Sequence, residues 1–112
     1  MDGKMDIAEQ KNHVADLLLH LEKALREQGL WAAQPPSLEQ MSSSEPFACD
    51  VMSLQAWLQW IFLPRMKVII ESEVELPRGC NISAYAEETL AKLDCETQTL
   101  MRLLQAMDKA LS

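Results

Sequence analysis

The sequence predicts an all-α protein, and three features lead to this prediction. Every sustained run of apolar residues repeats at intervals of three and four, which is the period of an amphipathic helix. Segments typical of helix starts and stops separate these runs. The chain has 112 residues, of which 48% are hydrophobic and 24% charged, as expected for one domain with one core. We therefore expect a single helical domain over residues 1–112, with a disordered stretch at residues 1–5.

The first helix is predicted from Ile7 to Gln28. Asp6 and Glu9 have the spacing of an N-terminal cap. Gly29 suits the residue that ends a helix in the left-handed conformation, and Leu30 would then close back on the last turn. One apolar stripe runs along this helix and consists of Val14, Leu17, Leu18, Leu21 and Leu25.

Residues 31–52 show no sustained period and are interrupted by Pro35, Pro36 and Pro46. Prolines of this kind break helices. The spacing of Ser37 and Gln40 predicts one short helical turn with a capping box. We expect this long loop to pack against the helices and to run from one end of the bundle to the other.

The second helix is predicted to start at Ser53, a suitable N-cap, and to end before Pro77. It is apolar on nearly all sides, with Leu54, Trp57, Leu58, Ile61, Val68 and Ile69 on one face and Trp60, Leu63 and Ile70 on the other. Pro64 predicts a kink or break, because proline lacks a backbone donor and crowds the preceding turn. In a helix that continued through Pro64, Arg65 would lie about 20° from Leu54 on the apolar face.

A second connection is predicted at residues 74–82, with Asn81 or Ser83 as the cap of the next helix. After this connection, apolar residues recur at helical spacing as far as Leu111. A single helix from Ser83 to Leu111 would be about 42 Å long, against about 33 Å for the first helix. We therefore predict a break at Asp94, a short third helix and a longer fourth. The expected fold is a four-helix bundle with a long packed loop and a Pro-kinked second helix.

The charge balance restricts the range of partners. Ten cations stand against seventeen anions, so the net charge is −7 and the isoelectric point is about 4.7. This balance disfavours direct binding of nucleic acid and of anionic membranes, both of which require a cationic surface. No apolar run reaches the length of a membrane span, and no signal peptide is expected. The chain is predicted to be cytoplasmic.

No sequence motif indicates a reaction, a metal or a cofactor. Cys49, Cys80 and Cys95 form no CxxC pair and are interpreted as reduced thiols, with Cys95 packing inside a helix. His13 and His20 are interpreted as members of a solvated helix face, because the spacing typical of metal sites is absent. Nucleophile-elbow and phosphate-loop motifs are also absent. We expect no catalytic residues, and the sequence does not support an enzyme.

Arg65 leaves three interpretations open. It could form a structural ion pair or carbonyl anchor that locks the kink. It could instead be turned outward to water by that kink. The third interpretation is an anchor for an anionic ligand or a partner, a role that suits the bidentate geometry of a guanidinium group.

Residues 58–66, which read L-Q-W-I-F-L-P-R-M, come directly after Trp57 and resemble the YqcC-like family of small bacterial proteins. Residues 29–31, 45–47 and 81–87 also resemble that family, so the similarity covers most of the chain. The resemblance implies an all-α, four-helix fold, a cytosolic setting and no established activity. Genes of this family often lie beside a tRNA pseudouridine synthase, and members sometimes carry its name. This chain shows no strand pattern on which such a mixed α/β enzyme could be built.

The first functional hypothesis is a protein-interaction module, with an RNA-modifying enzyme as a candidate partner. Its binding surface would combine Trp60, Leu63 and Ile70 with Trp31 and Phe47. Such a module is compatible with a homo-oligomer.

The second hypothesis is a small-ligand module. Its pocket would lie at the Pro64 kink, with Arg65 holding an anionic or apolar ligand. A closed apolar pocket ending on a free guanidinium group would favour this hypothesis.

Overall fold

The computed structural model describes residues 6–93 and 95–111, and within these residues all regular secondary structure is helical. The longer helices are α1 (Ile7–Glu27), α4 (Leu63–Glu71), α5 (Ile82–Leu90) and α6 (Gln98–Ala110). The connection after α1 contains the short helix α2 (Leu38–Met41) and the 3-10 turn η1 (Pro46–Ala48). The all-α prediction is confirmed, and residues 1–5 lie outside the described part of the chain.

Short-range signals in the sequence set the ends of α1. The Asp6 carboxylate accepts a hydrogen bond from the Glu9 backbone N–H at 2.7 Å. At the other end, the Leu30 N–H donates to the Leu25 carbonyl at 2.8 Å and Gly29 has a φ of 71°. These are the features of a Schellman stop. Both predicted ends are confirmed, with the helix ending one residue before Gln28.

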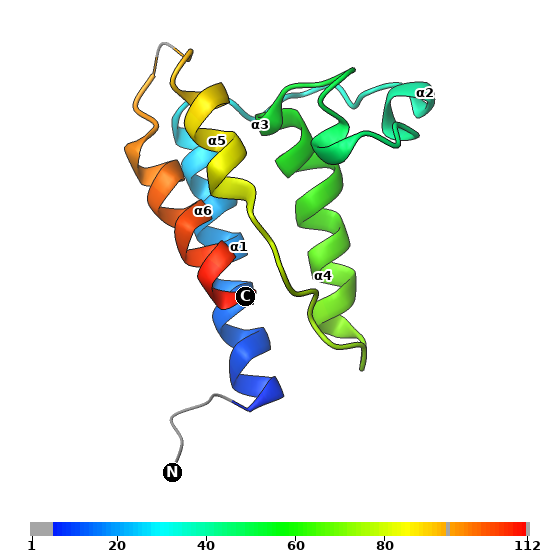
Figure 1. Ribbon diagram of the computed structural model, residues 1–112, viewed down its shortest axis with the longest axis vertical. Coiled ribbons are helices and arrows are strands. Elements are labelled where there is room, and N and C mark those ends of the chain that lie inside the picture. Colours follow the sequence, from blue (N-terminus) through cyan, green and yellow to red (C-terminus); the bar gives the residue numbers. More distant parts are fainter. Residues whose placement is uncertain (1–5, 94, 112) are drawn as a thin grey trace.

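The path of the chain differs from the prediction in one respect. Figure 1 shows that the connection after α1 stays at one end of the molecule, so its predicted course from end to end is wrong. The extended segment 72–81 instead runs back from the lower end of α4 to the start of α5, partway along the molecule (Figure 1). Its Leu76 is buried, and the Gly79 N–H donates to the Leu111 carbonyl at 2.9 Å. The loop stays at one end because the residues that anchor it to the helices lie there.

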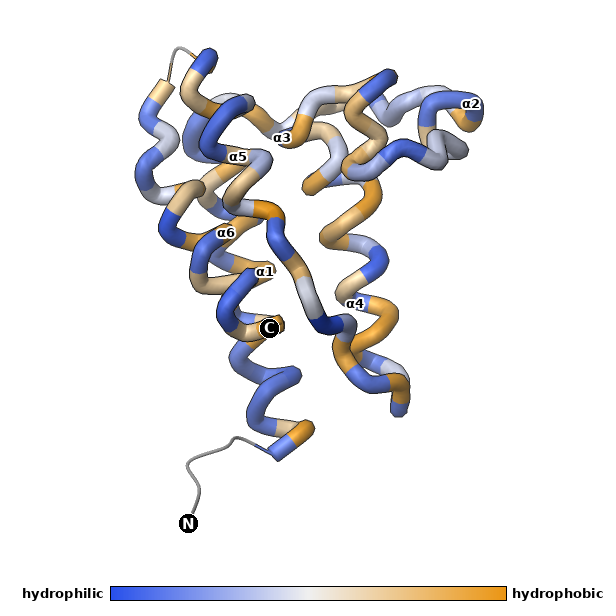
Figure 2. Tube along the Cα trace, viewed as in Figure 1, coloured by the Kyte–Doolittle hydropathy of each residue, from blue (hydrophilic) through white to orange (hydrophobic). Residues whose placement is uncertain are grey.

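One apolar core joins the helices. Figure 2 shows that apolar residues occur along the whole length of the helix that ends in α4. Within the core, α1 packs more extensively against α6 than against α4. The buried side chains include Val14, Leu17, Leu18, Leu21 and Leu25 of α1, Leu54, Leu58, Phe62, Leu63 and Met66 of the second long helix, and Ile82, Ala86, Leu90, Leu100, Leu104 and Met107 of α5 and α6.

The second long helix contains a π-turn. The chain passes from α3 (Leu54–Trp57) through the π-helical turn η2 (Leu58–Phe62) into α4. The Leu63 N–H donates to the Leu58 carbonyl, five residues back, while Leu58 and Leu63 both keep right-handed helical angles. The irregularity predicted at Pro64 therefore takes the form of a π-turn that ends just before the proline, which occupies the first turn of α4.

This π-turn changes which residues face the core. A π-turn places one extra residue in the helix, so the angular position of every later residue moves back by about 100°. Met66 then falls about 20° from Leu54, and Arg65 about 80° away. Accordingly, Met66 is buried, whereas Arg65 is exposed and Val68 is 67% exposed. The predicted assignments of Val68 to the core face and Leu63 to the opposite face are wrong for this reason.

The predicted division between the third and fourth helices is confirmed, because α5 ends at Leu90 and α6 begins at Gln98 with Thr97 as its N-cap. Asp94, the predicted cap, lies outside the described residues. At the start of α5, Asn81 occupies the cap position but its side chain makes no capping bond. The Asp108 carboxylate from α6 instead accepts the N–H groups of Ile82 and Ser83, each at 2.8 Å.

Candidate functional site

A surface hollow of about 550 Å³ lies where the second half of α1 meets residues 31–33 and the π-turn region. Its apolar walls come from Trp31, Trp60, Leu63 and Pro64. We call it the tryptophan hollow. Leu63 is buried at its base and the two tryptophans are half-buried at its sides, which is the composition expected of a binding depression.

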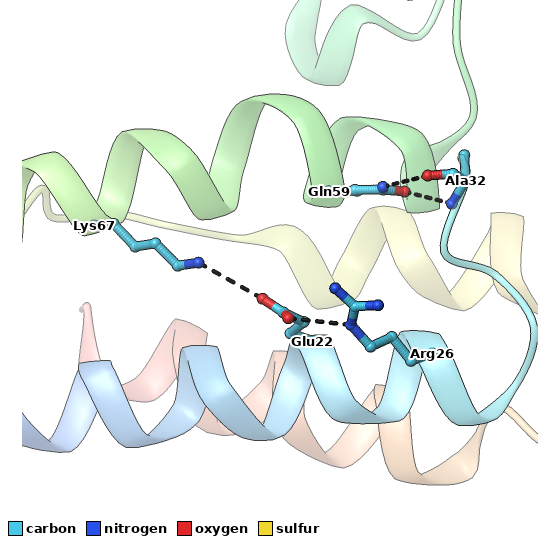
Figure 3. Close-up of polar contacts among 5 residues, drawn as sticks. All are labelled: Glu22, Arg26, Ala32, Gln59 and Lys67. Atoms are coloured by element: carbon cyan, nitrogen blue, oxygen red, sulfur yellow. Dashed lines mark hydrogen bonds and ion pairs between the residues drawn. The ribbon is translucent and has the colours of Figure 1, made fainter. Parts of the chain in front are cut away.

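Gln59 fixes one wall of the tryptophan hollow. Its side-chain oxygen accepts the Ala32 N–H at 2.7 Å, and its side-chain nitrogen donates to the Ala32 carbonyl at 2.8 Å (Figure 3). Gln59 is only 4% exposed, and a buried amide requires such partners. The pair therefore holds the chain after α1, and Trp31 with it, against the π-turn.

An ion cluster between α1 and α4 supplies the charged part of the wall of the tryptophan hollow. Glu22 contacts Arg26 at 3.1 Å and Lys67 at 3.6 Å, so that one carboxylate links two cations across the space between the helices (Figure 3). The Arg26 guanidinium also lies 4.4 Å from the centre of the Trp31 ring, within the range of a cation–π contact. These side chains are partly exposed, so the pairs add little to stability. They leave one excess positive charge at this place.

A second, smaller hollow of about 200 Å³ lies further along the same two helices. Its walls are Ala15, Leu18 and Leu19 of α1 and Ile70 of α4, together with Lys67 and Glu71. We call it the leucine hollow. Lys67 lines both hollows. The two hollows are therefore neighbours along the contact between α1 and α4. We call this contact, with both hollows and the ion cluster, the α1–α4 seam.

Four of the six residues singled out from the sequence lie on this seam. Trp31, Trp60 and Leu63 line the tryptophan hollow, and Ile70 lines the leucine hollow. Arg65 lines neither hollow and is exposed, as in the second of its three interpretations. The buried setting expected for Arg65 is wrong, because the π-turn rotates it away from the core face. Its role as an anchor for an anionic ligand or a partner stays a prediction.

Phe47, the sixth residue, belongs to a separate aromatic cluster. Its ring stacks on Tyr85 at 4.8 Å and meets Trp57 edge-on at 5.0 Å. Phe47 and Ala48 both have positive φ angles, of 58° and 48°, a conformation that non-glycine residues rarely adopt. The cluster anchors the loop near α3 and α5. Desolvation, with smaller effects of Cys49 and Glu88, raises the pKa of Tyr85.

The surroundings of Cys80 lower the reactivity of its thiol. Burial first, and then the neighbouring Asp108 carboxylate, raise the pKa of Cys80 to about 11. A thiol with a raised pKa is a poor nucleophile at neutral pH. Cys95 is half-buried and lies between α5 and α6, so its predicted place inside a helix is wrong.

The described part of the chain offers neither a metal-binding cluster nor a membrane-spanning helix. His13 and His20 are both exposed, and residues 6–93 and 95–111 hold no group of three or more histidine, cysteine or carboxylate side chains placed to bind a metal. None of the helices in these residues is long and apolar enough to cross a bilayer.

Sequence reasoning overlooked Gln59 and the place of Lys67 in the ion cluster. A glutamine inside an otherwise apolar stretch is a signal of a buried hydrogen-bonding role, and it was available in the sequence. Glu22 and Arg26 have the spacing of a helix ion pair. The contribution of Lys67 comes from another helix and has no local signal.

Known proteins resemble this chain over most of its length. A family profile, DUF446, described as "tRNA pseudouridine synthase C" matches residues 13–110. An uncharacterised protein of Haemophilus influenzae is 37% identical over 99 residues, which span 88% of this chain and 92% of that protein. The uncharacterised protein YqcC of Escherichia coli is 32% identical over 79% of this chain and 81% of its own length. The solution NMR structure of Escherichia coli YqcC superimposes with a TM-score of 0.79 at 28% identity and covers 91% of this chain.

One further relative is much longer than this chain. A protein of Pectobacterium carotovorum named tRNA pseudouridine synthase C is 46% identical over 70 residues. Those residues make up 62% of this chain but only 19% of the Pectobacterium protein. Most of that protein thus lies outside the matched segment.

Proposed function

Because the chain belongs to the YqcC-like family, we propose that it is a protein-interaction module that acts together with a tRNA pseudouridine synthase. One observation carries this proposal. A protein named as such a synthase contains a segment similar to this chain within a much longer polypeptide. In the Pectobacterium protein, the segment similar to this chain and the rest of the polypeptide are held at high effective concentration, because they share one chain. In another organism, the two corresponding parts can be separate proteins that bind each other.

The chemistry of the described residues supports a binding role over a catalytic one. The large pKa shift falls on Cys80 and suppresses its reactivity. The polar groups of the seam are an amide that bonds backbone and an ion cluster whose charges are largely paired. We assign the synthase reaction to the part of the Pectobacterium protein outside the matched segment.

The charge of the chain suits this partnership. An enzyme that handles tRNA needs a cationic surface to bind phosphates, and a chain of net charge −7 is attracted to such a protein over long range. The proposed setting is the bacterial cytoplasm, with the helices acting as one rigid bundle.

The proposal is tested with the part of the Pectobacterium protein that lies outside the matched segment, purified on its own. Isothermal titration with this chain should give saturable binding with a dissociation constant of roughly 10 µM or tighter. The variant Arg65→Ala, altered at an exposed position away from both hollows, is the control and should bind equally well. An absence of binding by the wild-type chain at about 100 µM would contradict the proposal.

A small-ligand module is the second candidate, supported by the size of the tryptophan hollow. Its volume of about 550 Å³ is within the range of small-molecule pockets. The anion contacts would come from Arg26 and Lys67, since Arg65 lies elsewhere. NMR titration with inorganic phosphate and with indole separates the two chemistries. Saturable shifts confined to Trp31 and Trp60 would support this candidate, and unchanged spectra at millimolar ligand would count against it.

A further inference from the structure

The α1–α4 seam carries apolar surface at two places, one in each hollow. Leu19 lines the leucine hollow and is 67% exposed although it lies in the middle of α1. Trp31 and Trp60 are half-buried in the tryptophan hollow. The three charged side chains of the ion cluster line the tryptophan hollow, and Lys67 among them also lines the leucine hollow. The seam therefore presents two apolar depressions with charged side chains in their walls.

The spacing of the two hollows corresponds to two turns of a helix. Along α1, Leu19 precedes Arg26 by seven residues, a rise of about 10 Å. Along α4, Leu63 precedes Ile70 by seven residues, which gives the same rise of about 10 Å. A helix lying in the seam would place the side chains of residues i and i+7 about 10 Å apart and on one face. A strand would need about three residues for this distance, and its two side chains would then point to opposite faces.

The charge of the ion cluster sets a further requirement. Arg26 and Lys67 share the single carboxylate of Glu22, which leaves one excess positive charge at the ion cluster itself. Glu71, one helical turn beyond Lys67, also lines the leucine hollow, so the four charged side chains of the seam sum to zero. An acidic side chain between the two apolar anchors would be complementary to the excess charge of the ion cluster. A second copy of the chain docked seam to seam would instead bring two positively charged clusters together.

We propose that the α1–α4 seam binds one amphipathic helix of the synthase partner. This helix inserts apolar side chains at positions i and i+7 into the two hollows and presents an acidic side chain to Arg26 and Lys67. The inference rests on the proposed function, because it names the synthase as the source of the helix. It adds the surface, the kind of element and the side-chain pattern that this surface recognises.

Site-specific crosslinking tests the geometry. A photoreactive amino acid is introduced at position 19 in the leucine hollow or at position 33 beside Trp31, where Leu19 and Ala33 are both exposed in the wild-type chain. Each variant is irradiated with the same purified part of the Pectobacterium protein, and the captured peptides are identified by mass spectrometry. The two positions should capture residues seven or eight apart in one helical segment. Capture in unrelated segments, or in a second copy of this chain, would overturn the inference.

Matched substitutions test the energetics by isothermal titration with the same partner. Leu19→Glu and Lys67→Glu alter the seam, and each should weaken binding by at least about tenfold. Leu38→Glu makes the same change at an 88% exposed leucine on α2, and Arg65→Glu makes the same reversal on α4 away from the seam. Both controls should bind within about twofold of the wild-type chain.

The outcomes separate the two proposals. Circular dichroism and thermal unfolding first establish that each variant folds, and Leu19→Glu alone carries the test if Lys67→Glu does not. Weakening by the seam variants together with unchanged controls supports the inference. Equal binding by all four variants overturns the seam as the docking surface and leaves the proposed function intact. An absence of binding by the wild-type chain overturns both.

Discussion

Both polar atoms of the Gln59 side chain bond to a single residue, Ala32, and the amide is 4% exposed. A buried amide without partners is destabilising, so the pair exists only if the chain after α1 lies beside the π-turn. The sequence showed the glutamine but not its partner, because the two residues lie 27 positions apart. Contacts of this range depend on the fold and have no local pattern.

We expect Gln59→Ala to lower the free energy of unfolding by about 1–3 kcal/mol, because it leaves the Ala32 backbone groups without their partner. Denaturant titration measures the change. Gln105→Ala, at an exposed position on α6, is the matched control and should change stability by less than about 0.5 kcal/mol. Equal effects of the two variants would show that the pair does not hold the loop.

Cys80 gives a prediction about reactivity. Its pKa is raised from 9.0 to about 11 by burial and by the Asp108 carboxylate. At pH 8 the folded protein should therefore carry about a hundredfold less thiolate at this position than the unfolded chain. In a Cys49→Ser, Cys95→Ser variant, iodoacetamide should alkylate Cys80 about a hundredfold more slowly in buffer than in denaturant at the same pH. Comparable rates would contradict the placement of this thiol.

The raised pKa of Cys80 also predicts how the stability of the folded protein changes with pH. The folded state holds its proton more tightly than the unfolded state, so the contribution of Cys80 is fully present below pH 9. It is lost as the pH rises from 9 towards 11. The raised pKa of Tyr85 acts in the same direction at high pH, so alkylation is the more specific measurement.

At the scale of the elements, the sequence predicted helix ends better than helix faces. The caps at Asp6, Ser37 and Ser53 are all present, because each depends on residues three positions apart. The prediction of which residues of the second long helix face the core was wrong after the π-turn. A period analysis assumes a constant angle per residue, and one extra residue before Pro64 changes every later position.

We expect this π-turn to accommodate Pro64. Pro64→Ala alone should change the free energy of unfolding by less than about 1 kcal/mol, because the π-turn directly before the proline already shifts the hydrogen-bond pattern that the missing N–H would interrupt. Deleting Ile61 should convert the π-turn into an α-turn and place the proline inside a continuous helix. Pro64→Ala should then recover about 3 kcal/mol in the deletion background.

Denaturant titrations of the wild-type chain, the Pro64→Ala variant, the Ile61 deletion and the chain with both changes form a double-mutant cycle. This cycle gives the coupling free energy between Ile61 and Pro64. Deleting Ala106 in α6 is the control, because it removes a residue from a regular helix and rotates the rest of that helix by about 100°. That deletion should not be rescued by Pro64→Ala. A recovery near zero in the Ile61 deletion would show that the proline and the π-turn are independent.

At the scale of the whole molecule, periodicity and composition predict the all-α fold. The binding surface expected from the sequence grouped Trp31 with Trp60, Leu63 and Ile70, which all lie on the seam, but no sequence pattern indicated how they come together. Trp31, Trp60 and Leu63 come from segments about 30 residues apart in the chain and lie together through the Gln59 pair and the π-turn. The four-helix bundle stays a prediction, because the extended segment 72–81 also contributes to the core through Leu76. Long-range placement of this kind depends on the sum of packing contacts and has no short sequence pattern.

The distribution of charge over the molecule leads to the last prediction. The net charge is −7, and Lys23, Arg26 and Lys67 are paired with Glu27 and Glu22. Among the described residues the other exposed cations are spread along the chain, with Arg65 on α4, Arg78 in the extended segment, Lys92 after α5, and Arg102 and Lys109 on α6. Stable binding of RNA needs several cations along one surface, since affinity depends on the number of phosphates neutralised. We therefore expect no binding of tRNA by the isolated chain at about 150 mM salt, measured by fluorescence anisotropy.

The synthase part of the Pectobacterium protein is the positive control in this measurement, and it should bind the same tRNA with or without this chain. If the chain docks through its seam, adding it should increase the anisotropy of the complex, because a larger particle rotates more slowly. Lys67→Glu should abolish that increase while leaving the binding of tRNA by the synthase unchanged. A salt-sensitive complex between tRNA and this chain alone, at sub-micromolar concentration, would show that a local cationic surface outweighs the net charge. The route from this chain to RNA would then be direct, without a protein partner.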